Sequence, residues 1–334
     1  MSTIKQVSKM AGVSSATVSR VINQPDSVKP DTREKVTQAM LALNYRYNGI
    51  AASLSSKKSN TIGYVVPELH GFFFGGMISG TEQVLRKANK HMLVAAGHSN
   101  ERDEVDAIEY LRSRRCDALI LHVEAVSDGY LRELAEQDVP FVVVNRYIDS
   151  IGEQCIALDN EKGGYLSTRC LIDAGHKQIA YIAGSLWKAD GSARLSGHKR
   201  ALKEAGLHFD PRLMYEGTFR PQSGLDGIRK LLETGVAFTA LACGNDEMAS
   251  GAIDGMRQQG INVPAEVSVI GFDNVEFCNY MSPRLTTVNY PTQTIGESAA
   301  RWVLSQVYNQ TLVPFEHIIS PHIVARDSVS QYRA

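Results

Sequence analysis

The sequence predicts an all-α helix-turn-helix headpiece followed by an α/β core of two doubly wound parallel-sheet subdomains. The chain has 334 residues, of which 43% are apolar, so it can bury a large core in two or three domains. Residues 1–58 carry nine basic side chains against three acidic ones, whereas the whole chain has a net charge of −1. From Asn60 onward, β-branched runs alternate with helical stretches. A basic unit on a larger acidic body indicates that one end binds a polyanion.

Three short helices are expected in the basic segment. Thr3 can cap a first helix, Ile4–Met10, and the sequence AGV that follows supplies a turn. Ser14 begins a second helix, which has apolar residues on one face and small polar residues on the other. A third helix, Thr32–Leu43, would close the core. This order is typical of a helix-turn-helix unit, whose second helix enters a DNA groove.

The remaining chain repeats a strand-then-helix pattern in two similar sets, which favours two parallel sheets covered by helices. The expected strands are TIGYVV, MLVAA, DALIL and PFVVV in the first set, then CIAL, QIAYIA, FTALAC, VSVIGF and TTVNY. The expected helices are Phe73–Asn89, Glu101–Arg114, Ser127–Gln137, Glu161–Ala174, Arg194–Ala205, Gln222–Thr234, Asp246–Gln259 and Thr294–Tyr308. Several crossovers should join the two halves.

The basic segment resembles a known family over a long and specific motif. The run IKQVSKMAGVSSATVSRVIN, continued by VKPDTREKV and LNYRYN, resembles the N-terminal signature of the LacI/GalR family of transcriptional repressors. The similarity continues through the body and covers essentially the whole chain. Two positions depart from the family pattern: Gln6 stands where Asp is usual, and Tyr47 stands where a Pro usually precedes the hinge Asn. The resemblance implies a core similar to periplasmic sugar-binding proteins, with a ligand held between its halves.

The resemblance also implies a division of the chain into three parts. Residues 1–47 would form the DNA-binding headpiece, residues 48–58 a hinge helix, and residues 59–334 the effector-binding and dimerisation core. Within the core, the N-subdomain would comprise about 60–158 and 290–317. The C-subdomain would comprise about 159–289 and 318–334.

The second helix would carry the residues that bind DNA. By the resemblance, Ser15, Ala16 and Arg20 occupy the positions that contact base edges, and an arginine suits guanine O6 and N7. Hydroxyl and amide side chains would position the phosphate backbone; these are Thr3, Ser14, Thr17, Ser19 and Asn23. The alternative is a helical bundle whose basic residues are simply solvated. The ordered string of small and polar residues favours DNA binding over that alternative.

Residues 48–58 are rich in alanine and serine and too short to form a stable isolated helix. The segment is therefore interpreted as a hinge helix that forms conditionally and begins at Asn48. Leu54 matches the family leucine that inserts into the minor groove at the operator centre. The alternative is a flexible linker whose leucine packs on the body.

Polar side chains follow several predicted strands of the body. Asn145 and Arg146 follow PFVVV, Asn245 follows FTALACG, and Asp273 follows VSVIGF, while Arg194 begins a predicted helix. Ligands of α/β sheets bind beyond the carboxyl ends of the strands, and such groups hold adjacent hydroxyls in bidentate fashion. These residues therefore predict a site for a neutral polyol. Their alternative role is helix capping and turn formation.

Three aromatic residues complete the predicted effector site. Phe219 could stack on a sugar face, and Tyr290 could contribute a hydroxyl contact. Phe73 resembles a cleft-mouth position where the family places apolar ligand contacts, although packing at a helix start is an equally good explanation. The similarity to galactose-type and β-glucoside-type repressors is closest at Asn145-Arg146 and around Asp273.

Other functional classes receive little support. The sequence has no G-x-S-x-G, G-x-G-x-x-G or G-x-x-x-x-G-K-[ST] motif, so neither an enzyme nor a cofactor is expected. The five scattered cysteines and the isolated histidines do not have zinc-site spacing. Charged residues interrupt every apolar stretch, and the first residues do not resemble a signal peptide, so we expect a cytoplasmic, nucleoid-associated protein with no membrane partner.

The sequence thus predicts a homodimeric repressor that binds double-stranded operator DNA at a palindromic site. A small sugar, of the galactoside or β-glucoside class, would bind between the subdomains and release the protein from DNA. Two alternatives remain. One is a regulator of the same family that a metabolite co-represses, and the other is a sugar-binding protein without a DNA function.

Overall fold

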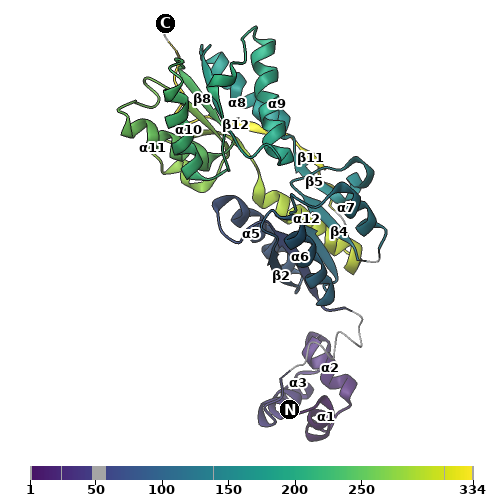
Figure 1. Cartoon of the computed structure of the whole chain (residues 1–334). Coiled ribbons are helices and arrows are strands. Elements are labelled where there is room, and N and C mark those ends of the chain that lie inside the picture. The colour runs from purple at the N-terminus through teal and green to yellow at the C-terminus, as the bar shows by residue number, and fades with distance from the viewer. Residues whose placement is uncertain (1, 24, 47–57, 138, 312, 333–334) are drawn as a thin grey trace. The chain divides into compact units, whose positions relative to one another are not determined.

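The computed structural model describes residues 2–23, 25–46, 58–137, 139–311 and 313–332 (Figure 1). The chain forms two compact units, and the boundary between them lies between Ser59 and Asn60. The first unit is all-α and the second is α/β, as the sequence predicts. Asn48 and Leu54, the two hinge residues with an expected role at DNA, lie outside the described residues.

The described residues of the first unit form the expected three-helix bundle. Its helices are α1 (Ile4–Ala11), α2 (Ser15–Asn23) and α3 (Pro30–Ala42), with a short 3-10 turn η1 (Pro25–Ser27) between α2 and α3. Thr3 caps α1 in a capping box, because its hydroxyl accepts from the Gln6 backbone while the Gln6 side chain accepts from the Thr3 backbone. The core residues are Val7, Val18, Val21, Val36 and Ala39, all buried. Gln6, one of the two departures from the family pattern, therefore has a structural role at the helix start.

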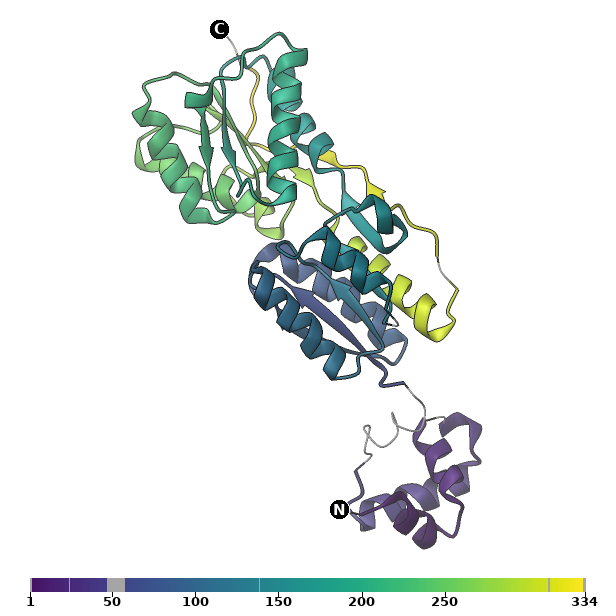
Figure 2. The ribbon, with the colours of Figure 1, turned by 45° about the vertical axis from the view of Figure 1, so that its right-hand side comes forward.

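The second unit contains two six-stranded sheets, each with helices on both faces (Figure 2). The first sheet has the order β11-β5-β4-β3-β1-β2 and the second has the order β12-β10-β9-β8-β6-β7. Neighbouring strands are parallel, except that β10 and β12 pair antiparallel. The strands of the first sheet are β1 (Thr61–Val66), β2 (His91–Ala96), β3 (Ala118–Leu121), β4 (Phe141–Val144), β5 (Cys155–Leu158) and β11 (Ile318–Ile319). Those of the second are β6 (Ile179–Ala183), β7 (Met214–Glu216), β8 (Ala240–Cys243), β9 (Ser268–Asp273), β10 (Thr286–Asn289) and β12 (His322–Val324).

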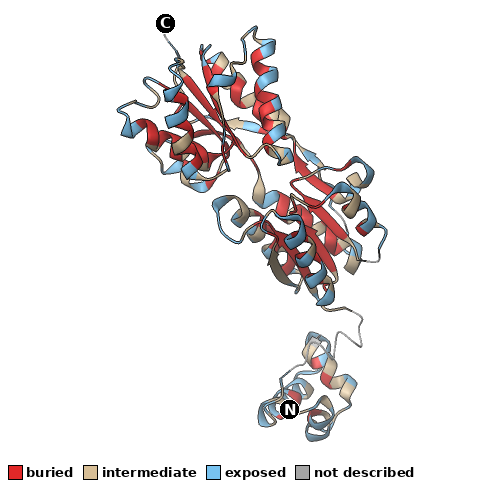
Figure 3. Cartoon of the chain, viewed as in Figure 1, coloured by how far each residue is buried: buried red, intermediate tan, exposed pale blue. Residues whose placement is uncertain are grey.

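The helices alternate with the strands along each half of the chain. The first sheet is covered by α5 (Phe72–Lys87), α6 (Glu101–Ser113), α7 (Asp128–Ala135) and α12 (Thr292–Tyr308), and the second by α8 (Asn160–Asp173), α9 (Ala189–Glu204), α10 (Pro221–Glu233) and α11 (Asp246–Gln258). Three more 3-10 turns are η2 (Asp149–Gln154), η3 (Pro211–Leu213) and η4 (Glu276–Asn279). Burial follows this layering, since the strands are mostly buried and the helices expose their outer faces (Figure 3).

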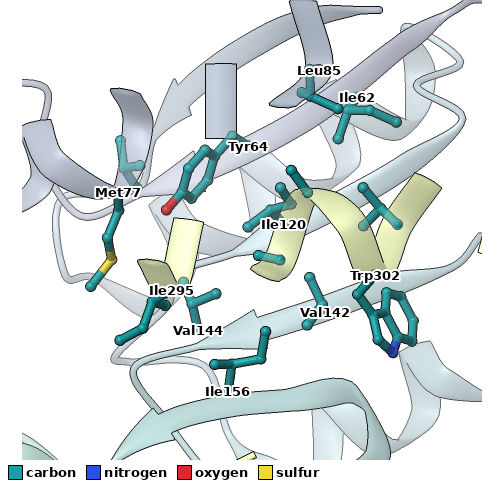
Figure 4. Close-up of a cluster of buried hydrophobic side chains, with 14 of the residues drawn as sticks. Ile62, Tyr64, Met77, Leu85, Ile120, Val142, Val144, Ile156, Ile295 and Trp302 are labelled. Atoms are coloured by element: carbon teal, nitrogen blue, oxygen red, sulfur yellow. The ribbon is translucent and has the colours of Figure 1, made fainter. Parts of the chain in front are cut away.

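The chain passes between the two subdomains three times. The crossings lie between β5 and α8, between β10 and α12, and between β11 and β12. Helix α12 follows a strand of the second sheet but packs on α5 and on strands β3 to β5 of the first. Its Ile295 and Trp302 enter the same apolar core as Tyr64, Met77 and Val142 (Figure 4). The third crossing follows Ile319, and β11 thus belongs to the first sheet.

Two local expectations were wrong or incomplete. Helix α9 begins at Ala189, so that Arg194 lies inside the helix and does not begin it. The glycine in KADGSA suggests a loop, but Gly191 packs against the Ser185 carbonyl, and Asp190 stabilises the first turn of the helix. Strands β7, β11 and β12 are only two or three residues long and are not predicted from the sequence.

Candidate functional site

The first candidate site is the exposed face of α2. Ser14 precedes this helix and caps it, because the Thr17 backbone N–H donates to the Ser14 hydroxyl at 3.1 Å. Ala16 and Arg20 are exposed, and Ser15 is half-buried. Among the described residues, Arg20 has no ion-pair partner, so its guanidinium is available to an external acceptor. The face therefore combines small residues with one available cation.

Most of the hydroxyl groups predicted to contact phosphate also form contacts within the helix-turn-helix unit. The Thr3 hydroxyl belongs to the α1 cap, and the Ser14 and Thr17 hydroxyls lie 2.9 Å apart at the start of α2. The Ser15 hydroxyl donates to that of Ser8 at 3.3 Å, which links α2 to α1. Ser19 is half-buried and also has an interaction partner. The side chain of Asn23 lies outside the described part of the chain. Several of these hydroxyls therefore organise the helices from which DNA would be contacted.

The second candidate site is a cleft between the two subdomains of the second unit. Its cavity measures about 590 Å³ including the open mouth, a size suited to a small-molecule ligand. Six of the eight predicted effector residues line it: Phe73, Asn145, Arg194, Phe219, Asn245 and Asp273. They come from the carboxyl ends of β4, β8 and β9, from the segment after β7, and from the helices α5 and α9, so the strand-end rule brings residues from both sheets to one place.

Arg194 is the central buried group of the cleft. Its side chain is only 2% exposed, and its guanidinium lies 3.7 Å from the centre of the Phe272 ring. Its Nε donates to Asn160 Oδ1 at 2.9 Å, and one Nη donates to the Gly244 carbonyl at 2.6 Å. The same Nη lies 3.4 Å from Asp273 Oδ1. These contacts fix the guanidinium plane and leave it facing the cleft.

Asp273 is the buried anion that accompanies Arg194. It ends β9 with a φ of 118°, a conformation that L-residues seldom adopt, and it is 5% exposed. Burial raises the pKa of Asp273 well above its usual range, and the Arg194 guanidinium opposes that shift. Asp246, behind the site, accepts from the Thr287 hydroxyl at 2.6 Å, while burial raises its pKa to about 6. Arg194 is therefore the buried cation that favours the ionised form of Asp273 against the effect of burial.

Asn145 is held by two buried neighbours. The Tyr290 hydroxyl donates to Asn145 Oδ1 at 2.5 Å, and Asn145 Nδ2 donates to His122 Nε2 at 3.2 Å. Burial lowers the pKa of His122 to about 4, so its imidazole is neutral and can accept this hydrogen bond. Phe73 packs edge-on against Tyr290, with 4.9 Å between ring centres. Tyr290 thus lies behind Asn145 and orients its amide. Tyr290 is absent from the cavity wall, so the structure does not place its hydroxyl where the sequence predicts a ligand contact.

Two predicted residues of the C-subdomain form the opposite wall. The ring of Phe219 packs on the backbone of Gly184, where a Cβ would lie 2.0 Å from a ring carbon. Asn245 donates to the Phe219 carbonyl at 3.0 Å and accepts from the Met248 backbone at 2.9 Å. Asn245 is therefore both the α11 cap and part of the cavity wall, which combines the two roles that the sequence left open.

The structure does not place Arg146 in this cleft. Asn145 has a φ of 66°, and the chain turns there. Arg146 donates to the Val126 carbonyl at 2.7 Å and to Asp128 at 2.5 Å. It lines a neighbouring cavity that shares Asn145 and Asp190 with the cleft. The guanidinium of Arg146 is therefore held by Asp128 and is not among the side chains that line the cleft.

Sequence reasoning missed the charged pairs that cross the cleft. Lys188 of the second subdomain lies 2.5 Å from Glu124 of the first, and Ser99 bonds to both. Arg220 of the second pairs with Glu68 of the first. Such residues carry no pattern in the sequence, because only the tertiary fold brings them together. His122 was also missed, although it follows β3 as Asn145 follows β4.

The fold and the two sites define a class of protein: a helix-turn-helix unit joined to a two-subdomain core that resembles periplasmic binding proteins. Residues 3–48 match the family described as bacterial regulatory proteins of the lacI family, and residues 168–329 match the periplasmic binding protein-like domain. The HTH-type transcriptional regulator GalR of Escherichia coli K12 is 40% identical over 330 residues, which cover 99% of this chain and 96% of GalR.

Two solved structures extend this similarity to the whole chain. The lac repressor dimer bound to operator and the anti-inducer ONPF has a TM-score of 0.86 at 28% identity, covering 98% of this chain and 99% of that one. The complex of the transcriptional regulator CelR with cellobiose has a TM-score of 0.72 at 31% identity, covering 98% and 100%. The chain belongs to the LacI family of DNA-binding transcriptional regulators. The relatives named here are regulators and not enzymes.

In the part of the chain that the structure describes, no helix is both long enough and apolar enough to cross a bilayer. Within the same residues, no three His, Cys, Asp or Glu side chains are grouped so that they could hold a metal ion.

Replacing Arg194 with Ala should destabilise the core by about 3–5 kcal/mol near neutral pH, because Asp273 then loses its buried cation. The pKa of Asp273 in the folded state would rise further above its value in the unfolded chain, so the unfolded state would release its proton first as pH increases. The loss should therefore be largest at pH 8 and shrink toward pH 5. Urea unfolding of the whole chain at both pH values measures it.

The double variant Arg194→Ala/Asp273→Asn is the control, since it has no carboxylate at this position. It should lose the pH-dependent part of the destabilisation and keep the part that comes from the space left by the truncated arginine side chain. If the single variant is equally destabilised at pH 5 and pH 8, the role assigned to the ion pair is wrong.

Proposed function

We propose that this protein is a sequence-specific transcriptional repressor that binds a palindromic operator as a homodimer and is released by a small sugar in the cleft. The main support is the combination, in one chain, of an exposed recognition helix and a cleft lined by amide, carboxylate and guanidinium groups. Each site alone suits many proteins. Together they suit a regulator whose DNA affinity depends on a ligand.

The DNA contacts would come mainly from α2. Arg20 is exposed there and suits a bidentate contact with guanine, while Ser15 and Ala16 suit thymine-methyl or hydroxyl contacts. Phosphate contacts would come from Thr3, Ser14, Thr17, Ser19 and Asn23. Asn48 would begin a hinge helix on the operator, and Leu54 would insert into the minor groove at its centre, where the cost of bending DNA is offset by new contacts.

A homodimer is supported by the similarity to a repressor that was solved as a dimer on its operator. Two headpieces related by a two-fold axis match a palindromic site, because each recognition helix then reads an identical half-site. Binding to chromosomal DNA also implies that the protein acts in the cytoplasm, in association with the nucleoid.

A sugar is the effector class that the cleft supports best. Asn145, Arg194 and Asp273 offer planar groups that hold adjacent hydroxyls, and the rings of Phe73 and Phe219 offer faces for the apolar side of a pyranose. The solved relative that holds cellobiose supports the same class. A galactoside or β-glucoside would place the protein in the regulation of carbohydrate metabolism. The alternative is a co-repressing metabolite, which would strengthen operator binding.

Replacing Arg20 with Ala should weaken binding to the selected operator by about 1–3 kcal/mol and relax the base preference at one position of each half-site. In-vitro selection of DNA sites followed by fluorescence anisotropy measures both effects. Arg33→Ala is the matched control, because Arg33 is an exposed arginine of α3 whose nearest carboxylate, that of Asp26, lies 3.7 Å away. It should leave the preferred sequence unchanged. An unaltered preference in the Arg20 variant would exclude base contact by this residue.

Replacing Asp273 with Asn should abolish release from the operator by sugar while operator affinity stays within about threefold, because a buried amide cannot accept as the carboxylate does. Anisotropy of a labelled operator, titrated with galactosides and β-glucosides, measures release. Asp254→Asn, at a side chain whose neighbours Arg257 and Gln258 lie on the same exposed surface of α11, is the control and should respond normally. Normal release in the Asp273 variant would show that the effector binds elsewhere.

A further inference from the structure

The cleft wall carries more carboxyl groups than cationic side chains. It has five carboxyl groups and three cationic side chains: Glu68, Glu124, Asp190, Glu247 and Asp273 against Lys188, Arg194 and Arg220. Whether a phosphate group could bind here therefore depends on whether any of these cations is available to it.

Lys188 is already neutralised. Its Nζ lies 2.5 Å from Glu124 Oε2 and donates to the Ser99 hydroxyl at 3.2 Å. The side chains of Lys188 and Glu124 are only 17% and 10% exposed, so water screens this pair weakly. If a ligand displaced Glu124 from Lys188, the Glu124 carboxylate would be left unpaired in a poorly hydrated position, which is energetically costly.

The two arginines are occupied in the same way. Arg194 has its donors directed at Asn160, at the Gly244 carbonyl and at Asp273, and its second Nη lies 4.0 Å from Asp190. Arg220 pairs with Glu68 at the rim, where His70 also lies 3.4 Å from that carboxylate. Each of the three cations therefore has a carboxylate partner in the cleft itself.

Helices α5, α9 and α11 begin at the cleft wall, and N-termini are ordinarily favourable places for anions. Each of these three has a carboxylate already, whereas α10, whose cap residue Arg220 also lines the cleft, has no acidic residue in its first turn and begins with Pro221. Asp190 lies in the first turn of α9, and Glu247 lies in the first turn of α11. Glu247 also accepts from the backbone N–H of Phe72, the first residue of α5. A phosphate group would find these positions occupied by negative charge.

We propose that the cleft selects sugars without an anionic group and excludes their phosphorylated forms, with Glu124 and Asp190 as determinants of this selection. Uncharged hydroxyls can bond to the paired carboxylates and to Arg194 without displacing either partner. A phosphate could gain a cation only by breaking an ion pair, and it would then lie beside the released carboxylate. Amino sugars, whose charge is positive, should be tolerated. This inference rests on the proposed sugar-binding function.

The test measures dissociation constants of the full-length protein by isothermal titration. The probes are galactose, glucose, cellobiose and galactosamine, the 1- and 6-phosphates of the two hexoses, and inorganic phosphate. The phosphorylated form of any sugar that binds should bind at least 100-fold more weakly than its parent, and inorganic phosphate should not bind at millimolar concentration. Equal or tighter binding of a phosphorylated form, or of phosphate itself, would overturn the inference.

Two variants show whether charge is the cause. Glu124→Gln removes the anionic partner of Lys188 and should improve binding of a phosphorylated sugar or of inorganic phosphate at least tenfold. Glu233→Gln is the matched control, because it removes the carboxylate of an exposed Lys–Glu pair with Lys230 at 2.8 Å, outside the cleft. It should change nothing. If neither variant binds a phosphorylated sugar or inorganic phosphate more tightly than the wild type, Glu124 is not a determinant of the selection.

The two proposals fail in different ways. If no unphosphorylated sugar binds, the sugar part of the proposed function fails, while the phosphate titrations of the wild type and of Glu124→Gln still decide the inference about charge. If sugars bind and their phosphates bind as well, the proposed function stands and the charge selection is wrong.

Discussion

The cleft depends on one buried interaction, the contact of the Arg194 guanidinium with Asp273. A charge that is 2% exposed is stable only when its donors are satisfied, and here they reach α8, the end of β8 and the end of β9. The guanidinium also covers the Phe272 ring, so the polar floor of the cleft rests on the apolar core. The same atoms therefore stabilise the C-subdomain and define the ligand site.

The first subdomain meets this floor through groups that are themselves held in place. Asn145 is oriented by Tyr290 and His122, and the pairs Lys188–Glu124 and Arg220–Glu68 join the two subdomains at the cleft. Three chain crossings also connect the two subdomains. In the proposed function, a ligand that alters the cross-cleft contacts would shift an equilibrium between two arrangements of the subdomains.

Much of this could be predicted from the sequence, for reasons that concern topology. Strand ends of parallel sheets converge, so Asn145, Asn245 and Asp273 could be placed in the cleft from their positions after strands. Arg146 could not, because the turn at its neighbour decides the direction of its side chain. The Lys188–Glu124 pair could not either, since its partners are ordinary charged residues far apart in sequence. The helix-turn-helix unit was predictable because its caps and apolar spacing are local.

The measurement that tests the account most directly is the reciprocity between the two sites. Operator affinity is measured with and without saturating sugar, and sugar affinity is measured on the free and the operator-bound protein. If the cleft and the headpiece are coupled, sugar weakens operator binding and operator weakens sugar binding by the same factor. Sugar binding of equal affinity to the free and the operator-bound protein would contradict the account, because the cleft would then have no influence on DNA.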